Sequence, residues 1–173
     1  MKERYHNLSI EETTYRLNRM TPQVGSWILS VLLSATARSK SDATPEDEEA
    51  AREAMGSLSN EERAASLVEA MWLNAGASIS EEVFYKIQVH ALNACAVYPS
   101  GPDSTPIPVA TKDGRVADKT LEEDLTRYNR LVMEALKFNL CPFFLANMSK
   151  AIDLSSPSKP LNSPTVTGSS SAQ

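Results

Sequence analysis

The sequence has few of the residues from which metal sites and catalytic sites are usually built. It contains two histidines, His6 and His90, and two cysteines, Cys95 and Cys141. Neither histidine has a second ligand at a metal-binding spacing, and each cysteine lies in an apolar segment, where a thiol behaves as a small hydrophobic side chain. The sequence has no glycine-rich phosphate loop, nucleophile elbow or paired-histidine zinc helix. We therefore expect a protein that is not an enzyme and that holds no metal and no cofactor.

The sequence also lacks an excess of basic residues and long hydrophobic runs. It has 17 Lys and Arg against 22 Asp and Glu, a formal net charge of -5, whereas nucleic-acid binding depends mainly on clustered basic side chains. No run approaches the roughly 20 apolar residues of a membrane-spanning helix. Residues 1–14 are too polar for a signal peptide, and two cysteines make no disulfide framework. We expect a cytoplasmic protein that binds neither nucleic acid nor a membrane.

The first segment with a regular pattern is residues 8–17. Thr13, Tyr15 and Leu17 alternate with polar neighbours, which favours a strand. Ser9 and Glu12, by contrast, have the spacing of a helix capping box. We prefer a short strand or hairpin here.

Four later segments combine a helix N-cap with apolar residues at helical spacing. Their caps are Thr21 before Pro22, Ser59 with Glu62, Ser78 with Glu81, and Thr120 with Glu123. Their apolar faces consist of Val24, Trp27, Ile28, Val31 and Leu32; of Ala64, Leu67, Val68, Met71 and Trp72; of Val83, Phe84, Ile87, Ala91, Ala94 and Cys95; and of Leu121, Leu125, Tyr128, Val132 and Leu136. Gly76 is expected to end the second helix, and the short connection that follows predicts an antiparallel pair with the third.

The remaining segments are polar or rich in proline. Residues 39–49 fit either a solvated linker or a short helix that begins with acidic residues. Repeated prolines between residues 98 and 118 exclude a regular helix, and Asp113-Gly114 is a preferred turn for a small hairpin projecting from the helical body. Pro142 predicts a kink or a new helix start, and the last helical piece is expected to reach about residue 152.

Together these patterns predict a mainly α fold, a helical bundle of about four to six helices with one or two small β-hairpins. We expect residues 1–154 to form a single mainly helical domain. Residues 155–173 consist largely of Ser, Pro, Thr and Gly and contain no aromatic residue. Such a segment buries too little apolar surface to offset its ordering entropy, so we expect a disordered C-terminal tail.

Two adjacent aromatic residues, Phe143 and Phe144, are the first candidates for a protein-binding surface. Neighbouring residues on a helix point about 100° apart, so both cannot face one narrow core stripe. We favour burial of both in a wide bundle core, the alternative being that one of them is exposed and used for association with another protein. Met148 and Trp72 complete the set of candidate partner-binding residues.

Three stretches of the chain resemble the phage tail assembly chaperones, small helical proteins that attend the tape measure protein while a long phage tail is assembled. Residues 14–22 (TYRLNRMTP), which lead into an apolar helix, are similar to the start of that family. Residues 83–98, followed by a loop with Gly and Pro, resemble its middle. Residues 134–144 (EALKFNLCPFF) resemble its closing pattern, a helix that ends in Phe-Asn-x and is followed by paired Phe. The family usually joins its N-terminal strands by a glycine turn, where this chain has Glu11-Glu12.

The resemblance implies a protein that needs no active site. It would work in the host bacterial cytoplasm and offer an apolar surface to a long helical client, the tape measure protein. It would self-associate to some degree around that client and leave before the tail is complete. In the family a second, longer product is often made by ribosomal frameshifting. A helical viral coat or tail subunit and a small adaptor protein are the alternatives that also fit a helical bundle without catalytic motifs.

Overall fold

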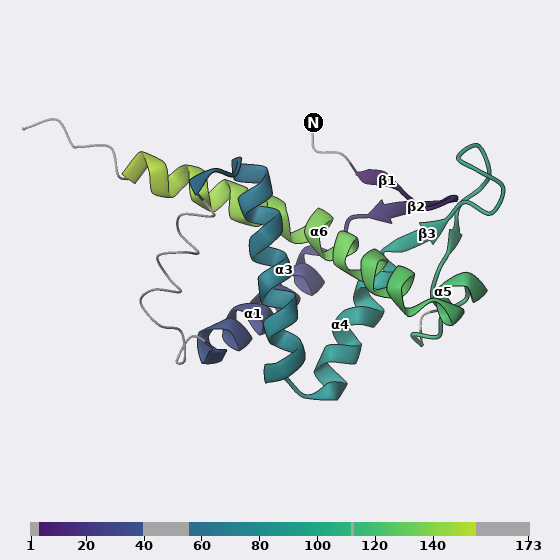
Figure 1. Ribbon diagram of the computed structural model, residues 1–173, viewed down its shortest axis with the longest axis horizontal. Helices are drawn as coiled ribbons and strands as arrows, with labels where there is room; N and C mark the ends of the chain where they lie inside the picture. The colour runs from purple at the N-terminus through teal and green to yellow at the C-terminus, as the bar shows by residue number, and fades with distance from the viewer. Residues whose placement is uncertain (1–3, 40–55, 112, 155–173) are drawn as a thin grey trace, which may run out of the picture.

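Helices dominate the structure, and a small sheet lies at one end of it (Figure 1). The computed structural model describes residues 4–39, 56–111 and 113–154, with the backbone alone at positions 39 and 148–154. The helices within these ranges are α1 (Pro22–Ser39), α3 (Asn60–Ser78), α4 (Glu81–Asn93), α5 (Lys119–Glu123) and α6 (Leu125–Leu154). The strands are β1 (Tyr5–Ile10), β2 (Thr13–Asn18), β3 (Cys95–Val97) and β4 (Ile107–Pro108). The prediction of a mainly helical protein is confirmed at this coarse level.

The four strands form one antiparallel sheet in the order β1-β2-β3-β4, which corrects the prediction of one or two separate hairpins. On β2, Tyr15 lies opposite Leu8 of β1 on one side and opposite Val97 of β3 on the other. The alternation that predicted a strand places Tyr15 and Leu17 in the core, with 0% and 1% of their surface exposed. The preference for a hairpin over a helix at residues 8–17 is therefore confirmed.

The hairpin turn between β1 and β2 is made without glycine. Glu11 has a φ of 53°, a left-handed backbone conformation that glycine adopts most easily. Its carboxylate accepts a hydrogen bond from the guanidinium of Arg127 in α6, and this pair is also an ion pair. An acidic residue thus takes the place of the turn glycine and ties the turn to the helical body.

The third predicted helix ends earlier than its apolar spacing suggested. Ala94 is the C-cap of α4, and Cys95 begins β3, where it lies opposite Leu17. The prediction that Ala94 and Cys95 belong to a helical face is therefore wrong. A strand of three residues is too short to display an alternating pattern, so its position could not be read from the sequence.

Three predicted helix ends, at Gly76, Ser78 and Thr120, are displaced by a few residues. Ser59 and Glu62 do form the capping box of α3. α3 continues through Gly76 to Ser78, however, and α4 is capped by Ser80, not by Ser78. The connection between α3 and α4 is short, as predicted, and the two helices diverge from it in a V (Figure 1).

The last helical region also begins differently from the prediction. Asp118 caps α5 in place of Thr120, and the side chain of Asp124 accepts a hydrogen bond from the N–H of Arg127 at the start of α6. Leu125, which was expected in the core, is 73% exposed because it stands at this helix start. α6 then runs to Leu154 and passes through Pro142 without a new helix start.

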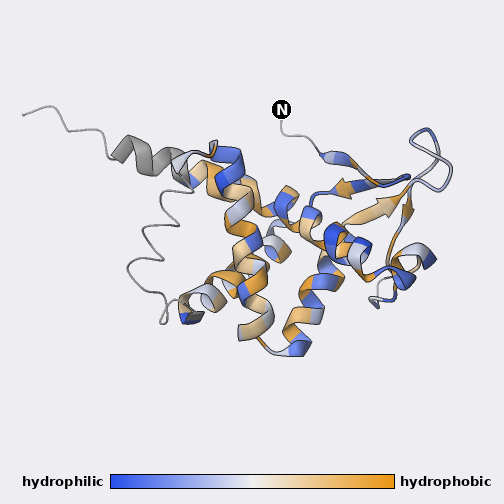
Figure 2. Ribbon diagram, in the orientation of Figure 1, coloured by the Kyte–Doolittle hydropathy of each residue, from blue (hydrophilic) through white to orange (hydrophobic). Residues whose placement is uncertain are grey.

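The core lies between the sheet and the helices α1, α3, α4 and α6. It includes Ile28, Leu32, Met71, Leu131 and Leu136, each at most 1% exposed. Trp72 of α3 belongs to the same cluster, and its ring stacks on that of Phe84 in α4 at a centroid distance of 4.3 Å. Figure 2 shows hydrophobic residues along β3 and in the middle of α3, and hydrophilic ones at the start of α4 and in α5.

The predicted hairpin at Asp113-Gly114 is reduced to a turn that packs on the body of the protein. A single antiparallel bridge joins Ala110 and Val116, and Gly114 has a φ of 88°. The carbonyl oxygen of Gly114 accepts a hydrogen bond from the Tyr85 hydroxyl of α4 at 3.5 Å. The prediction of a projecting hairpin is therefore wrong. The linker predicted before residue 50 and the tail predicted after residue 154 fall on residues 40–55 and 155–173, outside the described residues.

Candidate protein-binding site

Asn139 of α6 lies at a junction of segments that are far apart in the sequence. Its side-chain oxygen accepts a hydrogen bond from the N–H of Met20 at 2.8 Å, and its side-chain nitrogen donates to the carbonyl oxygen of Asn18 at 3.3 Å. Asn18 in turn donates from its backbone N–H and from its side chain to the carbonyl oxygen of Ala94, at 2.7 and 3.1 Å. One amide side chain therefore joins the end of β2 to α6, and β2 is joined directly to the end of α4.

Arg19 contributes a second contact at this junction, and Pro142 explains why it is available. Proline has no backbone N–H, so the carbonyl oxygen four residues earlier, that of Phe138, loses its usual partner in the helix. The guanidinium of Arg19 donates a hydrogen bond to this oxygen and also lies over the Phe138 ring, 3.7 Å from its centroid. The interruption in the hydrogen bonds of α6 is thus used to attach the chain between β2 and α1.

A hollow of about 200 Å³ opens beside the junction, between the start of α1 and the middle of α6. Its lining includes residues at the start of α1 and the apolar residues Met20, Leu29, Leu140 and Phe143. The Phe143 side chain is 47% exposed, and its ring meets the buried ring of Phe144 edge to face at 5.4 Å. A partner could therefore reach one face of an aromatic ring that its neighbour holds in place.

The structure does not gather the four predicted partner-binding residues on one surface. Phe143 is exposed, whereas Phe144 is 8% and Trp72 is 6% exposed. Phe144 and Trp72 are core residues, so a partner cannot reach them in this conformation. Met148 lies in α6, at a position where only the backbone is described. Of the set, Phe143 is the residue whose described side chain is open to a partner.

A second polar cluster holds the hairpin against the start of α5 and the start of α6. The hydroxyl of Tyr15 donates to a carboxylate oxygen of Asp118 at 3.4 Å, and Arg127 donates to the Thr13 hydroxyl at 3.3 Å as well as to Glu11. Burial, together with the nearby Asp118 carboxylate, raises the pKa of Tyr15 to about 12. The Tyr15 phenol therefore stays protonated at neutral pH, and the cluster's visible role is to fix the hairpin.

The cysteines and histidines contribute to packing. Both cysteines are free thiols, and burial raises the pKa of Cys95 to about 12. His6 stacks on Phe138 at 6.0 Å, and His90 meets the Trp27 ring edge to face at 5.7 Å. Within the described ranges, no group of three His, Cys, Asp or Glu side chains could hold a metal ion. No helix in the described part of the chain is long and apolar enough to cross a membrane.

Comparison with known proteins gives no further guidance on the site. No family model, no curated protein and no solved structure matches the chain. What this site does must therefore be argued from its own residues.

The residues that build the junction, Arg19 and Asn139, were not among the predicted site residues. For Arg19 the sequence does contain a usable signal. A proline inside a strongly helical segment frees the carbonyl oxygen four residues before it, so Pro142 points to Phe138 as an acceptor that needs an outside donor. Which donor comes to it depends on the tertiary fold, and no local pattern around Arg19 identifies it.

Proposed function

We propose that this chain is a tail assembly chaperone, which binds the tape measure protein in the host bacterial cytoplasm while a long phage tail is assembled. One observation carries the proposal. The three stretches that resemble the family are residues 14–22, 83–98 and 134–144, and they meet around Asn18 and Asn139. A protein of that family would need these three stretches to pack together, and the contacts at this junction support the proposal in that respect.

The apolar surface beside that junction supports the same proposal. A chaperone of this kind binds its client reversibly and performs no chemical step, so it needs exposed apolar side chains more than polar catalytic groups. Phe143 and Leu29 border the hollow next to the junction, and Phe143 is 47% exposed. We propose Phe143 as an anchor for an apolar residue of a helical client, in the manner of a helix bound in a groove.

The experiment that tests the function is co-expression with fragments of the tape measure protein encoded beside the chain. We expect at least one fragment to co-purify with the wild-type chain and to become more soluble in its presence. Phe143→Ala should weaken this binding by about 2 kcal/mol, with the helical content of the free protein unchanged. Leu125→Ala is the matched control, since Leu125 is an exposed apolar residue of the same helix that is 73% accessible.

Two results would count against the proposal. If no tape measure fragment binds the wild-type chain, the chaperone function is wrong. If the chain is found in stoichiometric amounts in finished particles, it is a structural subunit of the tail or coat, because a chaperone leaves before the tail is complete.

A further inference from the structure

Helix α1 has a second apolar seam besides the one that it buries. Its core seam consists of Ile28, Leu32 and Ala35, each at most 1% exposed. Beside it run five residues at the alternating spacing of three and four that helices use to pack on another helix: Val24, Trp27, Val31, Ser34 and Arg38. Trp27 in this second seam is 36% exposed. Ser34 and Arg38 are also exposed, whereas Val24 and Val31 are partly buried against the core. The second seam is therefore partly open to solvent on a helix that the first seam holds in place.

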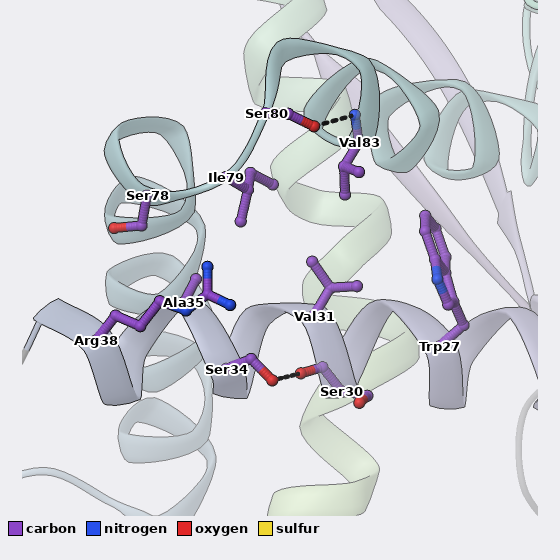
Figure 3. Close-up of a pocket in the computed structure, with 10 residues that line it drawn as sticks. All are labelled: Trp27, Ser30, Val31, Ser34, Ala35, Arg38, Ser78, Ile79, Ser80 and Val83. Atoms are coloured by element: carbon purple, nitrogen blue, oxygen red, sulfur yellow. Dashed lines mark hydrogen bonds between the residues drawn. The ribbon is translucent and has the colours of Figure 1, made fainter.

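The second seam forms one wall of a groove. The opposite wall is the corner between α3 and α4, and the groove has a volume of about 510 Å³. In Figure 3, Val31 points from α1 toward Ile79 and Val83, with Trp27 near one end and Arg38 near the other. The serine residues around the rim make local bonds: Ser34 donates to the carbonyl oxygen of Ser30, and Ser80 caps α4.

The groove is the right length for a helix. Val24 lies beyond the end of the groove, whose wall along α1 runs from Trp27 to Arg38. That wall covers eleven steps of the helix, or about 16 Å at 1.5 Å per residue, which matches about three turns of a second helix lying along α1. Trp27 and Val31 would take apolar residues of that helix, and its last turn would meet Arg38.

The charge of the groove differs from that of the protein. The chain has a formal net charge of -5, but α1 contains no acidic residue and Arg38 is the one charged side chain among those lining the groove. Glu82, which stands next to Val83 in the sequence, is paired with Lys86 at 2.8 Å. A basic end on an otherwise apolar groove favours an occupant with an acidic residue at that end.

We propose that this groove binds an amphipathic helix of the tape measure protein, with apolar residues on Trp27 and Val31 and an Asp or Glu facing Arg38. This inference rests on the proposed function and assigns the client a binding surface distinct from the hollow at Phe143. The groove and the hollow lie on different sides of α1, so substitutions can address them separately.

The test introduces a negative charge into the seam at two exposed positions. Ser34→Glu and Arg38→Glu are compared with Arg130→Glu, which makes the same change of charge as Arg38→Glu at an exposed position of α6. Affinity for a purified tape measure fragment is measured by titration calorimetry, and circular dichroism verifies that each variant is folded. We expect Ser34→Glu and Arg38→Glu to weaken binding by about tenfold or more, and Arg130→Glu to leave it within about twofold. Changing the matching acid of the client to Arg should restore binding to Arg38→Glu.

The possible outcomes separate this inference from the function. A wild-type chain that binds no fragment overturns both. If Phe143→Ala weakens binding of the fragment but neither seam variant changes it, the groove assignment is wrong and the proposed function stands. If the wild-type chain is a dimer that Ser34→Glu dissociates without loss of client binding, the groove holds a second copy and the client assignment is wrong.

Discussion

Gly114 lies so close to Val89 that a Cβ atom placed on it would meet Cγ2 of Val89 at 2.8 Å. The turn at Gly114 is thus fitted against α4, and it has no room for a larger residue. Gly101 provides a natural comparison, because it has a similar φ of 90° but no atom within 4 Å of its Cβ position. Backbone strain and crowding can therefore be measured separately in one protein.

We predict that Gly114→Ala lowers the free energy of unfolding by about 2–3 kcal/mol, the sum of a left-handed backbone penalty and an overpacking penalty. Gly101→Ala should cost only the backbone part, about 1 kcal/mol. Val89→Ala in the Gly114→Ala background should recover part of the loss. Urea denaturation of the wild-type chain, the two single glycine variants and the double variant measures the free energies of unfolding. Equal losses for Gly114→Ala and Gly101→Ala would contradict the close contact between Gly114 and Val89.

The two phenylalanines of α6 should differ sharply in their effect on stability. Phe144→Ala removes a core ring and should cost about 3 kcal/mol or more, because Phe144 is 8% exposed. Phe143→Ala removes a ring that is 47% exposed and should cost less than about 1 kcal/mol. Thermal unfolding of both variants gives the comparison. A larger loss for Phe143→Ala would mean that its ring is covered in solution.

Tyr15 should make the protein less stable at alkaline pH. Its pKa rises from 10.0 to about 12 on folding, so between these values the unfolded phenol loses its proton while the folded one keeps it. The unfolded state then binds fewer protons, and the free energy of unfolding falls as pH rises through this window, by up to about 2 kcal/mol. Below pH 10 the contribution is constant.

The measurement for Tyr15 is urea denaturation at several pH values between 9 and 11.5. Tyr15→Phe should flatten the alkaline loss relative to the wild-type chain. Tyr5→Phe is the control, because Tyr5 is 46% exposed. If Tyr15→Phe shows the same slope against pH as the wild-type chain, the phenol does not titrate as its burial requires.

The bond between Arg19 and Phe138 should depend on Pro142. Arg19→Met removes the donor and should cost about 0.5–1.5 kcal/mol, the usual net contribution of one hydrogen bond, because the bond is exposed and water can reach the Phe138 carbonyl. In a Pro142→Ala background that oxygen can accept from the N–H at position 142, so the same change should cost less. A double-mutant cycle by denaturation gives the coupling. Additive effects would show that Pro142 and Arg19 act independently.

The parts of the fold that follow from local patterns could be predicted from the sequence. Tyr15 and Leu17 indicated a strand, and the capping box at Ser59 marked the start of α3. The angle between adjacent helical residues raised exposure of one of Phe143 and Phe144 only as the less favoured alternative, and the structure has Phe143 exposed. These features depend on neighbours within a few residues, and such neighbours are visible in a single sequence.

The parts that depend on distant contacts could not be predicted. Cys95 continues an apolar helical spacing, and only its pairing with Leu17 of β2 makes it a strand residue. Trp72 fits both a core face and an exposed binding face until Phe84 is found stacked on it. Likewise, the groove at Val31 exists because the corner of α3 and α4 comes to lie against α1. In each of these cases tertiary packing determines the structure and overrides the local sequence pattern.

The position of β2 in the sheet has a consequence for synthesis of the protein. β2 is made well before β3 and Asn139, which hold it; Asn139 follows Met20 by 119 residues. Tyr15 and Leu17 therefore emerge from the ribosome long before their partners exist, and contacts this distant in sequence form slowly. The hairpin of β1 and β2 is translated well before the segments on which it docks. During that interval the nascent chain carries its own unprotected apolar segment, the same hazard from which we propose it shields the tape measure protein.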